Sequence, residues 1–344
     1  MRNEGQKKRR TIRWTRVLIW LIAIVLITAA VTLLLYLIPD DDSDVNALLT
    51  EPTTIRIETE TETEEPVNPV PKPEIDEQLL TINEYSRPGD KVDAIEYIVI
   101  HYLGNPKTTA QQNHDYFESL KDLQNVSMSA NFVIGIDGEI IECVPPGEIA
   151  YASNSMNHLS VSIENCHLDD SGRFTEDTYE SCVKLTAYLV AEYGLERESI
   201  IRHYDVTGKK CPLYYVENED KWEVFRDDVM NYIPARLSAL VMLAAGWLLK
   251  LDAKNGWKIF LRDRCNHASP NSAQTESVCA GLLGLRLAGD AWYHGELHKK
   301  KFIGDALREI EYEDIKCSCK LLYITAALSL ILLGGLKLLF LVVI

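Results

Sequence analysis

The stretch Ser199-Ile-Ile-Arg-His-Tyr-Asp-Val-Thr-Gly-Lys-Lys-Cys-Pro212 decides the fold when it is read together with Glu96-Tyr-Ile-Val-Ile-His101. Each stretch contains a short β-branched apolar run, which is typical of a buried strand. Each run ends on or next to a histidine, His101 or His203, and Cys211 follows shortly after the second. A lone histidine at a strand end is more often packed than a ligand. Two imidazoles and one thiolate, however, are the three protein ligands that a catalytic zinc takes, so the combination predicts a metal site.

A third stretch, Ser160-Val-Ser-Ile-Glu-Asn165, alternates like a strand and carries the carboxylate of Glu164 in mid-run. A carboxylate in a strand costs desolvation free energy unless it has a partner or a chemical role. Lys209 precedes Cys211 by two residues, and we expect it to reach the open side of the metal. The ordinary alternatives are a Glu164 satisfied by a hydroxyl or backbone amide, and a Lys209 that is a surface lysine like Lys210.

The sequence resembles the type 2 zinc N-acetylmuramoyl-L-alanine amidases, whose fold is shared by phage lysozyme-like amidases and peptidoglycan recognition proteins. The matching phrases lie within about residues 79–230 and are Tyr97-Ile-Val-Ile-His101, Ser129-Ala-Asn-Phe-Val-Ile-Gly-Ile-Asp-Gly138, Ile149-Ala-Tyr-Ala-Ser-Asn154, Val161-Ser-Ile-Glu-Asn165 and Arg202-His-Tyr-Asp-Val-Thr-Gly-Lys-Lys-Cys-Pro212. The resemblance implies an α/β fold in which helices flank a central mixed sheet.

The activity that this resemblance implies is hydrolysis of the amide bond between N-acetylmuramic acid and the L-alanine of the peptidoglycan stem peptide. The implied cofactor is Zn2+, and its implied ligands are His101, His203 and Cys211. Glu164 is then the expected general base and acid. Lys209 is expected to stabilise the developing oxyanion.

Two further residues, Tyr151 and Asn154, are expected to contact the glycopeptide substrate, although ordinary loop residues would match the sequence equally well. Some family members carry a tyrosine where this chain has Ala130, which leaves Glu164 as the acid–base candidate. The same fold also serves as a non-catalytic peptidoglycan receptor when the metal cysteine is replaced. Because Cys211 is present, the enzyme is the favoured prediction.

Bulk composition excludes some classes of function. The chain has 344 residues and a formal net charge of −16, so a nucleic-acid partner is not expected. Its eight cysteines do not form a disulfide framework in a chain of this length. Cys143, Cys166 and Cys182 are expected to pack as small apolar residues, and a Cys166–Cys182 bridge stays open as an alternative.

The N-terminal region predicts a membrane anchor. Residues 1–16 form a basic tail with seven Lys or Arg side chains, and Val17–Ile38 follows with 22 uncharged residues. About 20 apolar residues span a bilayer, whereas the apolar part of a cleaved signal peptide is shorter, about 7–15 residues. The basic flank predicts a cytoplasmic N-terminus in the bacterial cytoplasmic membrane and an extracytoplasmic amidase domain that faces the cell wall. Residues 39–78, acidic and then proline-rich, predict a disordered linker.

The expected amidase domain, residues 79–232, contains an Asp137-Gly138 hairpin signal between Phe132–Ile136 and Glu139–Cys143. Its predicted helices are Thr108–Leu120, Thr175–Tyr193 with Thr175 as cap and Gly194 as terminator, and Trp222–Ile233. His114 lies inside the first of these helices and is interpreted as a surface histidine.

The remaining residues, 233–344, predict a helical membrane segment. Phrases such as Arg262-Asp-Arg-Cys-Asn-His-Ala-Ser-Pro-Asn-Ser-Ala273 resemble the C-terminal third of the cobalamin-biosynthesis membrane protein adenosylcobinamide-phosphate synthase, over about residues 227–330. A cobalamin-pathway membrane protein is therefore a further alternative for function. Leu237–Leu249 is short for a membrane span, whereas Leu321–Ile344 is long enough.

Overall fold

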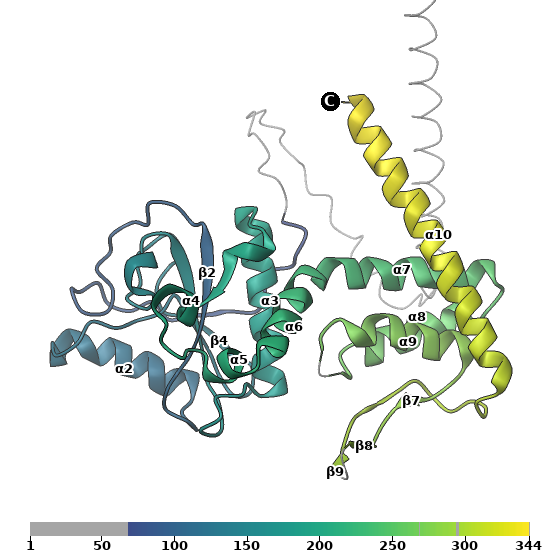
Figure 1. Ribbon diagram of the computed structural model, residues 1–344, viewed down its shortest axis with the longest axis horizontal. Helices are drawn as coiled ribbons and strands as arrows, with labels where there is room; N and C mark the ends of the chain where they lie inside the picture. The colour runs from purple at the N-terminus through teal and green to yellow at the C-terminus, as the bar shows by residue number, and fades with distance from the viewer. Residues whose placement is uncertain (1–67, 268, 294–295, 344) are drawn as a thin grey trace, which may run out of the picture. The chain divides into compact units, whose positions relative to one another are not determined.

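The computed structural model describes residues 68–267, 269–293 and 296–343 (Figure 1). The predicted basic tail, the predicted N-terminal membrane helix and most of the predicted linker lie outside these residues. The described residues divide into two compact units. The first comprises residues 68–235 together with 269–271, and the second comprises the other described residues from 236 onward.

The first unit is built on a six-stranded sheet in the order β1-β4-β3-β5-β2-β6. Its strands are Asp76–Glu77 (β1), Tyr97–Tyr102 (β2), Phe132–Ile134 (β3), Ile140–Glu142 (β4), Ser160–Asn165 (β5) and Ile200–Arg202 (β6). Strands β3 and β4 pair antiparallel, while β1 with β4, β3 with β5, and β2 with both β5 and β6 pair parallel. The predicted α/β fold with a central mixed sheet and the predicted hairpin are confirmed.

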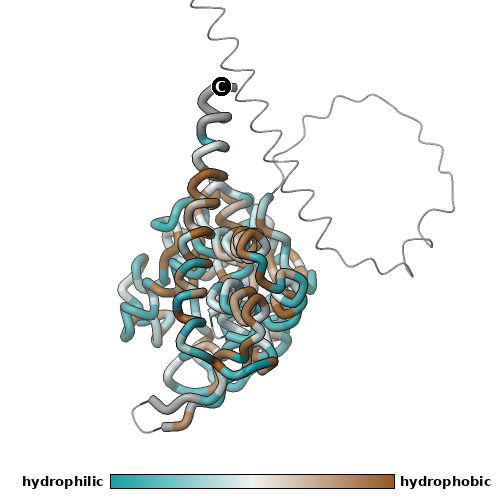
Figure 2. Tube along the Cα trace, turned by 90° about the vertical axis from the view of Figure 1, so that its right-hand side faces the viewer, coloured by the Kyte–Doolittle hydropathy of each residue, from teal (hydrophilic) through white to brown (hydrophobic). Residues whose placement is uncertain are grey.

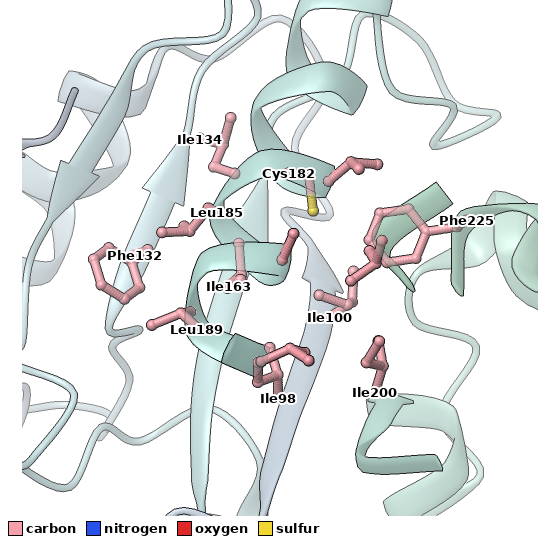
Figure 3. Packing of buried hydrophobic residues seen from close by; sticks show 14 of the residues in the cluster. Ile98, Ile100, Phe132, Ile134, Ile163, Cys182, Leu185, Leu189, Ile200 and Phe225 are labelled. Atoms are coloured by element: carbon pink, nitrogen blue, oxygen red, sulfur yellow. The ribbon is translucent and has the colours of Figure 1, made fainter. Parts of the chain in front are cut away.

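Helices cover both faces of this sheet. Its longer helices are Ala110–Leu123 (α2), Glu176–Tyr193 (α3) and Glu219–Met230 (α6); its short ones are His203–Thr207 (α4), Leu213–Glu217 (α5) and the 3-10 turns Asn154–Met156 (η2) and Arg197–Ser199 (η3). In Figure 3, Ile98, Ile100 and Ile163 from the sheet pack with Leu185 and Leu189 of α3. Trp222 and Phe225 of α6 belong to the same buried cluster.

The opposite face of the sheet packs with α2. Phe117 and Leu120 of α2 form a second buried cluster, which includes Val133 of β3. Side chains alternate between the two faces along a strand. Since Ile98 and Ile100 face α3, the histidine that ends the β2 run, His101, lies on the α2 side of the sheet.

The helix ends follow the sequence signals. The Thr109 hydroxyl caps α2 by accepting from the Gln112 backbone N–H, and the Gln112 side chain accepts from the Thr109 backbone N–H. The Thr175 hydroxyl caps α3, and Gly194 ends it with φ of 62°. That left-handed conformation carries no Cβ penalty in glycine. The predicted cap and terminator of α3 are thus confirmed.

Two expectations about this unit need correction, and one about its cysteines is confirmed. Residues 68–78 were expected in the linker, but Val70 is buried in the α3-side cluster and β1 pairs with β4, because this edge of the sheet offers backbone partners. His114 was expected at the surface, yet it is buried and its Nε2 lies 2.8 Å from the carbonyl oxygen of Gln78. The expectation that Cys143, Cys166 and Cys182 pack as small apolar residues is confirmed, and the alternative Cys166–Cys182 bridge is absent, since these two thiols belong to clusters on opposite faces of the sheet.

The second unit is mainly helical. Its helices are Tyr232–Leu248 (α7, which begins within the first unit), Ala253–Asp263 (α8), Ser272–Leu283 (α9) and Tyr312–Val343 (α10). Two small sheets pair Leu287–Ala288 (β7) with Phe302–Ile303 (β10), and Ala291–Tyr293 (β8) with Glu296–His298 (β9). Leu243, Phe260, Val278, Leu282 and Leu321 contribute to its main core.

One helix among the described residues is long and apolar enough by itself to cross a membrane, over Tyr312–Lys337 of α10. Figure 2 shows brown, hydrophobic stretches along this C-terminal helix. Several of its apolar side chains are exposed, among them Leu330, Ile331 and Leu333. Helix α7 meets the same criterion when it is joined to α6 across a bend of 60°. The C-terminal apolar helix predicted from the sequence is therefore present, and it begins earlier than Leu321.

Candidate metal centre

The register of the three parallel strands β2, β5 and β6 brings His101, Glu164 and His203 together at the carboxyl ends of these strands. In the β2–β5 pair, His101 lies directly opposite Glu164. In the β2–β6 pair, Ile100 lies opposite Arg202, so His203 follows one residue beyond the paired segment. Because paired residues share a face, His101 and Glu164 both point to the α2 side of the sheet.

The side chain of Arg202 anchors the segment that carries His203. Its guanidinium donates to Asp205, to Glu219 at 2.7 Å and to the carbonyl oxygen of Tyr215 at 2.9 Å. The Asp205 carboxylate also accepts from the Arg202 backbone N–H at 2.8 Å, which starts helix α4 directly after β6. His203, the first residue of α4, is thereby held close to the strand end.

A tight turn returns the chain from α4 to the same place. Gly208 ends α4 with φ of 76°, and the Tyr204 backbone N–H donates to the carbonyl oxygen of Cys211 at 2.9 Å. One ligand atom each from His101, His203 and Cys211 then lies within 4.8 Å of the other two. The Cys211 Sγ atom is 3.8 Å from His101 Nδ1. All three side chains are buried.

Burial controls the protonation of these three groups. It lowers the pKa of His101 well below its ordinary value, with smaller contributions from His203 and Lys209. Burial likewise lowers the pKa of His203, and it raises the pKa of the Cys211 thiol to about 12. Neutral imidazoles are ready to coordinate a cation, whereas the thiol needs a positive charge beside it to ionise. The donor set therefore fits a divalent metal such as zinc.

The carboxylate of Glu164 lies beside this cluster. Its Oε1 atom is 3.8 Å from His101 Nδ1. Its Oε2 atom is buried and has no hydrogen-bond partner among the described residues. Burial raises the pKa of Glu164 to about 7, and the positive charge of Lys209 opposes this shift. A half-buried carboxylate with a buried, unpartnered oxygen next to three metal-type ligands is suited to exchange protons with a molecule at the centre.

The two lysines of the Gly-Lys-Lys-Cys turn differ in their surroundings. Lys209 is exposed, and its positive charge lowers the pKa of His101 and His203 and opposes the rise in the pKa of Glu164. Lys210 pairs instead with Glu217, with 2.9 Å between Nζ and Oε1.

The two residues expected to contact substrate both lie in the chain segment before β5, and one of them, Asn154, contacts the cluster. Tyr151 is half-buried, and burial raises the pKa of its hydroxyl. Asn154 is exposed, and its Oδ1 atom lies 3.0 Å from His203 Nε2. Its neighbour Ser153 places Oγ 3.0 Å from His101 Nε2. Sequence patterns did not single out Ser153, and its position beside Asn154 was the available signal. Ala130 is fully buried and offers no proton donor.

Comparison with known families divides the chain in the same way. Residues 91–213 match the family model described as N-acetylmuramoyl-L-alanine amidase, and residues 225–322 match the one described as CobD/Cbib protein. The two-part resemblance predicted from the sequence is thus confirmed.

Individual relatives cover different parts of the chain. A probable N-acetylmuramoyl-L-alanine amidase of Bacillus licheniformis is 27% identical over 230 residues, which is 63% of each chain. The cobalamin biosynthesis protein CobD of Clostridium perfringens is 52% identical over 89 residues, 26% of this chain and 28% of that protein. Among solved structures, a mutant endolysin from Bacillus subtilis is 24% identical with a TM-score of 0.39, covering 45% of this chain and 97% of the endolysin. The chain therefore spans less than two thirds of either curated relative.

Proposed function

We propose that this chain, which carries an amidase-family domain followed by a CobD/CbiB-family domain, is a zinc-dependent N-acetylmuramoyl-L-alanine amidase. Its substrate would be peptidoglycan, cut between N-acetylmuramic acid and the L-alanine of the stem peptide. The observation that supports this most is the meeting of His101, His203 and Cys211 beside a buried, unpartnered carboxylate oxygen of Glu164. A non-catalytic peptidoglycan receptor would have no use for such a carboxylate.

The surroundings of each group support its proposed role in the reaction. Zinc held by His101, His203 and Cys211 would supply Lewis-acid activation of water and of the substrate carbonyl. Glu164 accepts a proton from the attacking water and returns it to the departing amine of L-alanine. Its raised pKa keeps both protonation states accessible near neutral pH. Lys209 places positive charge where negative charge develops on the carbonyl oxygen.

The test of this proposal is removal and return of the metal. The purified full-length chain in detergent should release free amino groups from peptidoglycan, lose that activity in a strong chelator and regain it when zinc is added. The physical reason is that the buried donors His101, His203 and Cys211 would hold the zinc, and the zinc would activate the attacking water. Full activity of a chain shown by elemental analysis to hold no metal would contradict the proposal.

A pair of adjacent lysines offers a matched prediction. We expect Lys209→Ala to lower the turnover number about 10²–10³-fold, the scale of losing one oxyanion donor. Lys210→Ala should change turnover little, because the Lys210 ammonium pairs with Glu217. Initial rates of amine release from peptidoglycan measure both. If Lys210→Ala proved the more damaging change, the assigned role of Lys209 would be wrong.

The location that we propose is the bacterial cytoplasmic membrane, with the amidase domain on the outer side. It is supported by the apolar helix over Tyr312–Lys337 and by the uncharged run Val17–Ile38 behind a basic tail. The alternating Thr/Glu and Pro-rich stretch would then be a tether toward the cell wall.

Residues 250–320 are proposed to lie on the cytoplasmic side, and this topology makes a labelling prediction. A membrane-impermeant thiol reagent should label an engineered Ser43→Cys chain at residue 43 in intact cells, and peptide mapping should find Cys265 unlabelled until the membrane is opened. Cys265 is exposed in its own unit, so the bilayer would have to protect it. Labelling of Cys265 in intact cells would exclude a cytoplasmic second unit and leave the N-terminal crossing unaffected.

The second unit supports an alternative function, a step of cobalamin biosynthesis. Its match to CobD covers 28% of that protein. A cobalamin-pathway activity would appear as conversion of cobinamide substrates by membranes that contain the chain.

A further inference from the structure

The consecutive residues Ser153 and Asn154 contact the two candidate ligand histidines, His101 and His203, in each case at the Nε2 atom of the ring. Ser153 Oγ lies 3.0 Å from His101 Nε2, and Asn154 Oδ1 lies 3.0 Å from His203 Nε2. The rings themselves are neighbours, with centroids 4.7 Å apart. One short turn of chain therefore contacts both imidazoles of the candidate metal centre.

The other ring nitrogen of His101, Nδ1, lies near Cys211 and Glu164. Its Nδ1 atom is 3.8 Å from Cys211 Sγ and 3.8 Å from Glu164 Oε1. A neutral imidazole carries one proton, so a proton on Nε2 leaves the Nδ1 lone pair free for a cation. The Ser153 hydroxyl can accept the Nε2 proton of His101.

For His203, the hydrogen-bond partner itself determines which ring nitrogen carries the proton. An amide oxygen accepts hydrogen bonds and cannot donate them. With Asn154 Oδ1 as the partner, His203 Nε2 must carry the ring proton, and Nδ1 is left unprotonated. Nδ1 is then the nitrogen that the His203 ring can offer to a cation.

Hydrogen bonds within the chain hold the turn that carries Ser153 and Asn154. Asn157 Oδ1 accepts from the backbone N–H groups of Ala152, at 3.3 Å, and Ser153, at 2.6 Å. The Ser153 side chain is buried with 1% of its surface exposed. Asn154 has φ of 54°, a left-handed conformation that asparagine and glycine tolerate better than other residues.

We propose that Ser153 and Asn154 are a positioning pair, which sets the ring tautomers and orientations of His101 and His203 so that both present Nδ1 to the metal. This inference rests on the proposed function for the identity of the metal as zinc. Outer partners of metal-bound histidines fix tautomer and ring orientation, and their loss typically lowers metal affinity about 10–100-fold. Neither residue needs to touch the substrate for this role.

The test compares zinc affinity among matched variants of the full-length chain in detergent, by competition with a chromogenic chelator. We expect Ser153→Ala to weaken zinc binding about 10–100-fold, and Asn154→Gly about 10-fold because its contact is more open to water. Glycine is the right truncation, since it keeps the left-handed backbone without strain. Asn154→Asp keeps an acceptor oxygen and should retain wild-type affinity to within about threefold. Ser155→Ala, at an exposed position of the same turn, is the control.

A second readout separates positioning from a general structural role. Cobalt(II) substituted for zinc should give an altered ligand-field absorption spectrum in Ser153→Ala and a wild-type spectrum in Asn154→Asp and Ser155→Ala. The thermal melting of the metal-free proteins should be unchanged throughout. Wild-type zinc affinity in both Ser153→Ala and Asn154→Gly would overturn the inference, as would affinity losses that merely track lower melting temperatures.

Failure of the inference can be told from failure of the proposed function. If the wild-type chain binds zinc and hydrolyses peptidoglycan while the truncation variants bind zinc equally well, the positioning role alone is wrong. If the wild-type chain binds zinc, the variants bind it weakly and no hydrolysis occurs, the positioning role stands and the proposed reaction is wrong. A wild-type chain that binds no zinc overturns both.

Discussion

Glu164→Gln is expected to lower the turnover number about 10²–10⁴-fold while zinc remains bound, because general acid–base catalysis contributes on that scale. The substitution keeps the size of the side chain and removes its ability to exchange a proton. The prediction rests on the raised pKa of Glu164 and on its buried Oε2 atom, which has no hydrogen-bond partner among the described residues. Initial rates of amine release, with zinc content measured on the same samples, test the expectation.

A matched control is available in strand β4. Glu142 is a partly buried strand carboxylate whose pKa is also raised by burial, and it lies outside the candidate metal centre. Glu142→Gln should leave turnover close to wild type. Retention of most activity in Glu164→Gln, or a loss of zinc equal to the loss of activity, would show that Glu164 is not the proton carrier.

Cys211→Ser is expected to abolish both zinc retention and activity. A serine hydroxyl is a far poorer zinc ligand than a thiolate, and removing a ligand should exceed the about 10–100-fold cost of losing an outer partner. We therefore expect zinc affinity to fall by more than about 100-fold. Equilibrium dialysis against zinc followed by elemental analysis measures the change.

The control for this prediction is another buried cysteine. Cys143 lies in the α2-side cluster, where burial raises the pKa of its thiol, and it is not part of the candidate metal centre. Cys143→Ala should bind zinc with wild-type affinity. A Cys211→Ser chain that still held one zinc per molecule would mean that other residues bind the metal.

Strand and helix positions were largely predictable, since local signals and tertiary packing agree there. The β-branched run before His101 forms β2, and Thr175 and Gly194 bound α3 as their capping chemistry requires. The grouping of His101, His203 and Cys211 was predicted partly from ligand type and partly from family resemblance.

Apart from that grouping, contacts between segments distant in sequence could not be predicted from local signals. That Glu164 faces His101 depends on the register between β2 and β5, which neither strand sets alone. The contacts of Ser153 and Asn154 with the histidines depend on how the η2 turn packs, and they join residues about fifty positions apart. His114 is buried because the carbonyl oxygen of Gln78, from a segment expected to be linker, lies against it.

The most direct test of the central claim is mass spectrometry of the products that the full-length chain releases from purified peptidoglycan. The proposed activity predicts soluble stem peptides that begin with a free L-alanine amine, together with glycan strands whose N-acetylmuramic acid residues have lost their peptides. The Glu164→Gln chain should release neither. Cleavage between sugars, cleavage within the stem peptide, or binding of peptidoglycan without any release would contradict the claim.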